Sequence, residues 1–143
     1  GWLYDDVFAA IAELGLEERV RVLGFVDDND LPALYRGADV FAFPSLYEGF
    51  GIPVLEAMGC GTPVVTSNVS SLPEVAGDAA LQIPPDDVDA LADALWRSIG
   101  DTALRESHRT RGFERVARFT WRRAAEDLIG VYARVAPLHG GLQ

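Results

Sequence analysis

The sequence of 143 residues contains no lysine and a single cysteine, Cys60. Without a lysine, the chain alone cannot run a reaction that needs a Schiff-base amine. One cysteine cannot form an internal disulfide or supply a cysteine-rich zinc site, and it favours a reducing compartment. No apolar run approaches the ~20 residues of a membrane helix, and no basic-then-apolar signal pattern begins the chain. We therefore expect a cytoplasmic protein.

Positive charge is also scarce. All twelve cations are arginines, nine of them follow residue 96, and the net charge is −10. Nucleic acids are bound by clustered cations, so this balance excludes a nucleic-acid partner. The arginines near the C-terminus leave two interpretations open: solvated helix faces, which we favour, and peripheral contact with an anionic membrane surface.

Short apolar segments alternate with helical patterns along the chain. Strands are predicted at 19–25, 40–43, 63–66 and 80–83. Helices are predicted at 5–14, 31–36, 52–59, 71–74, 86–99, 102–118 and 121–135. This alternation predicts an α/β fold, with a parallel sheet and helical crossovers.

Capping residues and periodicity add local detail. Asp86 is the expected cap of helix 86–99, Thr120 caps the last helix, and Ser71 with Glu74 has capping-box spacing. The last helix is expected to turn an apolar face inward. That face consists of Trp121, Ala125, Leu128, Tyr132 and Val135.

A turn with two glycines joins strand 40–43 to helix 52–59. Such a turn points free backbone N–H groups outward at the carboxyl end of a parallel strand, where phosphate binds. Glu48 lies on the turn and Glu56 within the helix. Carboxylates accept hydrogen bonds from vicinal hydroxyls, so this pair suits a nucleoside-diphosphate sugar. An ordinary α/β turn with two solvated glutamates has the same spacing.

The same stretch carries a family resemblance. It reads Phe43-Pro-Ser-Leu-Tyr-Glu-Gly-Phe-Gly-Ile-Pro-Val-Leu-Glu-Ala-Met, with seven residues between Glu48 and Glu56. It resembles the donor-binding C-terminal half of glycosyltransferase family 4, whose members are retaining, metal-independent enzymes of the GT-B fold. The likeness extends upstream to Val22 and downstream to Trp121. It implies a Rossmann-like domain, no cofactor, and transfer of a hexose from a nucleotide-sugar donor.

The resemblance also implies roles for individual residues. Glu56 is similar to the glutamate that holds the donor ribose. Glu48 is similar to the one beside the transferred sugar, which makes it the expected catalytic residue; a covalent nucleophile is the less favoured role. The other expected donor-binding positions are Gly49, Phe50, Gly51 and Ile52, whose turn receives the diphosphate, and Val26, which begins the nucleobase wall.

Compared with that family, the sequence begins late and is expected to be an N-terminally truncated donor domain over 1–135, with a loose tail at 136–143. The arginine and lysine that clamp the diphosphate, and the acceptor domain that closes over the donor, have no counterpart in it. We therefore expect the chain alone to be almost inactive. Strands 19–25 and 40–43 would face a gap, filled by strand exchange, by a homodimer or by direct pairing of the two strands.

Three other functions remain open. A nucleotide-sugar epimerase-like domain would share the fold but needs acid and base side chains that we cannot place. A phosphorylase would need a lysine. A non-enzymatic, self-associating fragment would not bind the donor. Cys60 is set aside as a buried small side chain, and Asp27, Asp28 and Asp30 as a solvated loop. His108, expected on a polar face among arginines, and His139, in the tail, are set aside as bases.

Overall fold

The computed structural model describes residues 5–135 and divides into two compact units, residues 1–31 and 32–143, which are described separately. In the first unit, helix α1 (Asp5–Glu13) ends where Gly15 adopts a φ of 64°, and the N–H of Leu16 bonds back to the carbonyl of Ile11. This confirms the helix predicted at 5–14. The domain predicted over 1–135 stays a prediction, and the tail at 136–143 lies outside the described residues.

The strand predicted at 19–25 is wrong. Residues 19–25 form no strand, and the Phe25 side chain is 91% exposed. An alternating pattern marks a segment that would suit a sheet, but a strand forms only where another strand satisfies its backbone groups. Residues 19–25 and 40–43 belong to different units, so direct pairing between them stays a prediction.

The second unit contains a parallel sheet of three strands. They are β1 (Phe41–Phe43), β2 (Val64–Ser67) and β3 (Ala80–Ile83), in the order β1-β2-β3. The register places Phe41 opposite Val64, and Val64 opposite Ala80. The three remaining strand predictions and the α/β class are confirmed.

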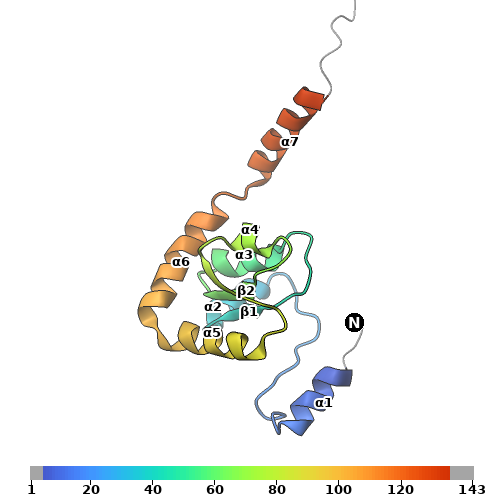
Figure 1. The fold of residues 1–143 in the computed structure, drawn as a ribbon, viewed down its shortest axis with the longest axis vertical. Coiled ribbons are helices and arrows are strands. Elements are labelled where there is room, and N and C mark those ends of the chain that lie inside the picture. Colours follow the sequence, from blue (N-terminus) through green and yellow to red (C-terminus); the bar gives the residue numbers. More distant parts are fainter. Residues whose placement is uncertain (1–4, 136–143) are drawn as a thin grey trace, which may run out of the picture. The chain divides into compact units, whose positions relative to one another are not determined.

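Six helices accompany these strands in residues 31–135 (Figure 1). They are α2 (Leu31–Gly37), α3 (Ile52–Gly59), α4 (Leu72–Ala76), α5 (Val88–Gly100), α6 (Thr102–Val116) and α7 (Trp121–Val135). Helices α3 and α4 cover one face of the sheet and α5 the other, while α6 packs against both α3 and α5. The sheet is therefore enclosed on both faces, as is typical of parallel sheets.

The core follows from the alternation of side chains along β2, which is buried throughout. Val64 packs with Val54, Met58 and Leu72 on the α3 and α4 side. Val65 packs with Ile83 and Ala94 on the α5 side. Each face of the central strand thus anchors its own helical layer.

Of the three predicted caps, Thr120 is confirmed, Asp86 is wrong, and Ser71 is the N-cap of α4 but lacks the side-chain bond of a capping box. Asp87, not Asp86, caps α5, because its carboxylate accepts from the N–H of Ala90. Ser71 makes no side-chain cap on α4; its hydroxyl donates to carbonyl groups of the turn before α3. Thr120 accepts from the N–H of Arg123 at 3.1 Å, as expected for the start of α7.

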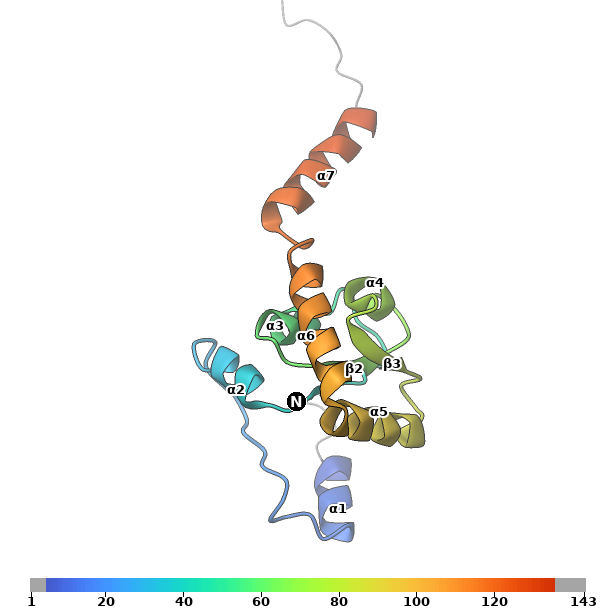
Figure 2. The ribbon, with the colours of Figure 1, turned by 90° about the vertical axis from the view of Figure 1, so that its left-hand side faces the viewer.

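The inward face predicted for α7 is wrong, because no residue of this helix is buried. Trp121 is 89% exposed, and Figure 2 shows α7 running on beyond α6, clear of the sheet. The apolar stripe is present in the sequence, but no described residue covers it. Within residues 5–135, no helix combines the length and the apolar character needed to cross a bilayer.

Candidate donor-binding site

The turn between β1 and α3 is held in shape by Gly51. This residue is buried, has a φ of 106°, and is the N-cap of α3. A Cβ at this position would lie 2.7 Å from Cδ2 of Leu72. Both the backbone conformation and the close approach require glycine, which explains why the strand can turn into the helix so tightly.

Free amides gather at this turn. No described residue accepts a hydrogen bond from the backbone N–H of Phe50, Gly51 or Ile52. Pro53, within the first turn of α3, has no N–H to satisfy. The positive end of the helix dipole therefore coincides with donors that no described residue uses.

Glu48 lies on the turn and is half-buried. Its Oε1 accepts a hydrogen bond from the hydroxyl of Ser45 at 2.9 Å. One carboxylate oxygen is thereby held by the end of β1, and the other is open to a ligand hydroxyl or to a developing positive charge.

Three serines, one at the end of β2 and two that follow it, hold the backbone of the same turn. The Ser67 hydroxyl donates to the Ser45 carbonyl at 2.6 Å. The Ser70 hydroxyl accepts from the N–H of Glu48 and donates to its carbonyl. The Ser71 hydroxyl lies 3.0 Å from the Glu48 carbonyl and 2.8 Å from the Phe50 carbonyl. The ends of two neighbouring strands thus fix one loop.

Glu56 lies on α3, one turn beyond Ile52, and is exposed. Residues four apart share a helix face, so Glu56 and Ile52 lie on the same face of α3. The Tyr35 hydroxyl, on α2, donates to Oε2 of Glu56 at 3.2 Å. Burial and then the Glu56 charge raise the pKa of Tyr35 to about 12, so this phenol stays protonated as a donor in ordinary buffers.

Phe50 connects the turn to the end of α6. Its ring meets that of Phe119 edge-on, with centroids 5.7 Å apart. The Arg115 guanidinium lies over the Phe119 ring, 5.0 Å from its centroid. Arg115 also donates to the carbonyls of Glu74 and Val75. A groove of about 690 Å³ opens here, lined by Phe50 and Ile52 and, among others, by Arg118, Trp121 and Arg123.

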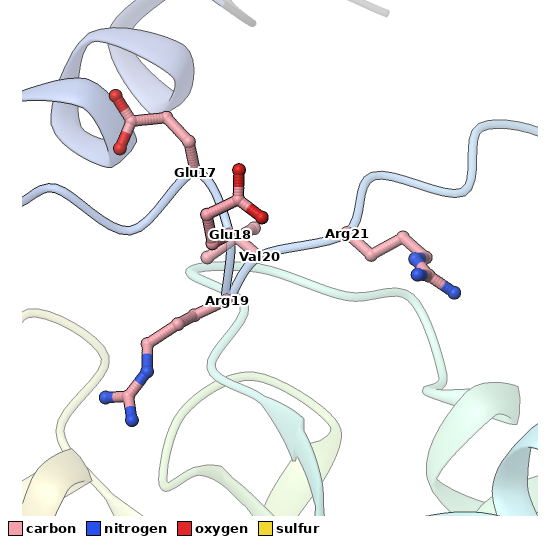
Figure 3. Close-up of a pocket in the computed structure, with 5 residues that line it drawn as sticks. All are labelled: Glu17, Glu18, Arg19, Val20 and Arg21. Atoms are coloured by element: carbon pink, nitrogen blue, oxygen red, sulfur yellow. The ribbon is translucent and has the colours of Figure 1, made fainter.

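Val26 belongs to the first unit, so its predicted contact with the nucleobase stays a prediction. That unit has a shallow hollow lined by Glu17, Glu18, Arg19, Val20 and Arg21 (Figure 3). The side chains of Arg19 and Arg21 point away from each other, and the side chains of the two glutamates point away from Arg19. We assign no site to this hollow. Among the described residues, no cluster of three or more His, Cys, Asp or Glu side chains could hold a metal ion.

Several residues of the site were missed from the sequence. Tyr35 lies 21 residues before Glu56 in the sequence. Ser70 and Ser71 lie 22 and 23 residues after Glu48. No spacing rule links such distant positions. Only Ser45, three residues before Glu48, could have been found from local sequence.

The family model for glycosyl transferases group 1 matches residues 4–115. The chain is 48% identical over 133 residues to the O-antigen chain mannosyltransferase B of Escherichia coli. The aligned region covers 92% of this chain and 35% of that protein.

Solved structures agree with this match. Sucrose-phosphate synthase from Thermosynechococcus elongatus superposes with a TM-score of 0.80 at 36% identity, over 90% of this chain and 33% of that one. HepE of Anabaena, solved in complex with UDP-glucose, superposes with a TM-score of 0.73 at 29% identity, over 79% and 31%. Both neighbours have the GT-B fold, and the chain spans about a third of the length of each relative. The Rossmann-like part of a GT-B fold is therefore confirmed, and the chain belongs to the group 1 glycosyl transferases.

Proposed function

We propose that the chain forms the donor-binding part of a retaining glycosyltransferase, which moves a hexose from a nucleoside-diphosphate sugar to an acceptor. One observation carries the proposal: free amides at the start of α3 are flanked by Glu48 on the turn and Glu56 on the helix. The amides bind the diphosphate and Glu56 binds the ribose hydroxyls. The complex of the relative HepE with UDP-glucose supports this assignment.

Glu48 acts on the transferred sugar in this proposal. As the bond to the diphosphate breaks, positive charge develops at the anomeric carbon, and a fixed carboxylate stabilises that charge. The amides stabilise the negative charge that collects on the departing diphosphate. Acceptor attack on the face that the leaving group vacates gives retention, and no metal ion is required.

Calorimetry tests the donor site. UDP-, GDP- and ADP-sugars are titrated into the protein as its gene encodes it, with EDTA present, and into Glu48→Gln and Glu56→Gln. We expect the Glu56 variant to lose most donor affinity and the Glu48 variant to bind donor but lose turnover. Unchanged affinity in the Glu56 variant would contradict the ribose contact.

Product analysis separates the alternatives. Transfer with retention gives an α-linked product from an α-linked donor, whereas an epimerase returns a nucleotide sugar with one inverted hydroxyl. A self-associating fragment without enzymatic function binds no donor.

We also propose that residues 1–143 by themselves bind donors no tighter than millimolar. Two absent clamp cations, at roughly 1.5–3 kcal/mol each, weaken binding by about 10² to 10⁴.

The second unit also leaves one edge of its sheet open, because β1 pairs only with β2 among the described residues. We propose that, in the chain by itself, a second copy covers this edge, as a homodimer or by strand exchange. In the whole protein, the N-terminal part of the larger relatives is the partner expected there. We propose a cytoplasmic location. We also propose that the arginines between 97 and 134 form solvated faces, and peripheral contact of these arginines with a membrane surface is the alternative.

A further inference from the structure

Ser70 has an unusual backbone. Its φ is 60°, and it is the only non-glycine residue with a positive φ among residues 5–135. A side chain with a Cβ is disfavoured there, and such a conformation persists only where the surrounding structure determines it. The side chain itself is exposed, so packing does not hold Ser70 in this conformation.

The contacts of its hydroxyl account for this conformation. The Ser70 Oγ accepts from the N–H of Glu48 at 3.1 Å and donates to the carbonyl of the same residue at 2.5 Å. One hydroxyl therefore holds the peptide groups on both sides of the Glu48 Cα. With both peptides fixed, the direction of the Glu48 side chain from the backbone is fixed as well.

We propose that Ser70 is a positioning residue for Glu48, an inference that rests on the proposed function of that carboxylate. Its hydroxyl sets the backbone of Glu48, while Ser45 holds one oxygen of the carboxylate. The stabilisation that a carboxylate gives to a developing charge depends steeply on its placement, and a shift of about 1 Å can cost 10²-fold in rate. The strained backbone at Ser70 brings the hydroxyl to the turn.

Ser70→Gly separates positioning from folding. Glycine adopts a φ of 60° without strain, so this variant loses the hydroxyl while the backbone is relieved. We expect an unchanged or slightly raised Tm, a kcat about 10-fold to 100-fold lower, and a KM for the donor within twofold of the original. A loss of structure alone would lower Tm and would not separate kcat from KM in this way.

Ser107→Gly is the matched control. Ser107 lies on α6, away from the turn, and glycine within a helix is destabilising. We expect this variant to have a lower Tm and an unchanged kcat, the reverse of Ser70→Gly. Ser70→Thr keeps the hydroxyl on a backbone that suits threonine poorly, so we expect a lower Tm with most of the kcat retained.

A double-mutant cycle completes the test, with all variants made in the protein as its gene encodes it. Because Ser70 acts through Glu48, Ser70→Gly combined with Glu48→Gln should be no slower than Glu48→Gln alone. A full kcat in Ser70→Gly, or additive losses in the double variant, would overturn the positioning role. If Glu48→Gln itself keeps full transfer activity, or if the original protein transfers no sugar, it is the proposed function that fails.

Discussion

At the scale of single residues, Gly51 bears most directly on the shape of the site. Its φ of 106° and the 2.7 Å approach of Leu72 Cδ2 leave no room for a Cβ. We expect Gly51→Ala to lower the free energy of unfolding by about 1–3 kcal/mol, measured by urea denaturation. Gly49→Ala is the control, because nothing lies within 4 Å of a Cβ at Gly49 and its φ is not in the left-handed region. Equal losses in both variants would contradict the requirement for glycine.

Tyr35 tests the support of Glu56. Tyr35→Phe removes the hydroxyl that donates to Oε2 of Glu56 at 3.2 Å. We expect calorimetry to show donor binding about 3-fold to 10-fold weaker, corresponding to a hydrogen bond worth roughly 1 kcal/mol. A variant that binds the donor as tightly as the original would show that Tyr35 does not orient Glu56.

The ionisation of Tyr35 gives a second measurement. Its pKa is raised from 10.0 to about 12, by burial and then by the charge of Glu56. The folded state thus holds this proton more tightly than the unfolded state. The corresponding stability is complete below pH 10 and is lost as the pH rises towards 12. Absorbance at 295 nm should show a late tyrosine transition that is absent from Tyr35→Phe.

At the scale of elements, the sequence predicted best where local signals and burial agree. The strands at 40–43, 63–66 and 80–83 are short apolar runs, and β2 is buried along its whole length. The segment 19–25 carried an equally clear alternation but forms no strand, because pairing depends on a partner that periodicity cannot reveal. The capping-box spacing correctly marks Ser71 as the N-cap of α4, but its side-chain bond does not form, because the hydroxyl contacts a distant loop instead.

The site shows the same division. Glu48, Glu56 and the glycine turn could be predicted because they lie within one continuous stretch of sequence. Ser70 and Tyr35 could not, because their roles depend on how β2 and α2 are placed beside that stretch. The conformation of Ser70 was also beyond prediction, since serine has no preference for the left-handed region.

His108 on α6 gives a prediction for an element. The polar face predicted for His108 is wrong, because its side chain is buried, and its Nδ1 has no hydrogen-bond partner. Burial, Arg111 and Arg97 lower its pKa, while Asp78 opposes the shift. The folded state then binds this proton less tightly than the unfolded state, so stability should be constant above about pH 6.5 and decrease below it. Urea denaturation from pH 7.5 to pH 5 should show this decrease.

His108→Gln is the comparison for that experiment. Protonation of carboxylates elsewhere also lowers the stability of the folded state in acid. The difference in pH dependence between the two proteins therefore isolates the contribution of His108. We expect a shallower decrease in the variant between pH 6.5 and pH 5. Parallel curves for the two proteins would contradict a role for His108.

At the scale of the whole molecule, the free edge of β1 is open to experiment. The N–H of Phe41 donates to the carbonyl of Pro63, so the backbone groups of Ala42 point to the opposite side. Ala42→Pro therefore removes a donor from the free edge without breaking the β1–β2 ladder. If a second copy of residues 1–143 pairs there, light scattering should show a dimer for the original chain and a monomer for the variant.

Circular dichroism is the control for this comparison, because both proteins should keep the same helix content. A monomer for the original chain would rule out association through this edge. A dimer that persists in the variant would place the contact elsewhere, and the exposed apolar stripe of α7 would be the next surface to test.

The order of the strands has a consequence for biosynthesis. Since β1, β2 and β3 are neighbours in the sheet in the order in which they are made, β2 and β3 each leave the ribosome when the preceding strand is already present. Among these three strands, β1 waits only for the next strand along the chain, so little of their backbone stays unpaired during translation. The second unit can thus assemble step by step as it is synthesised.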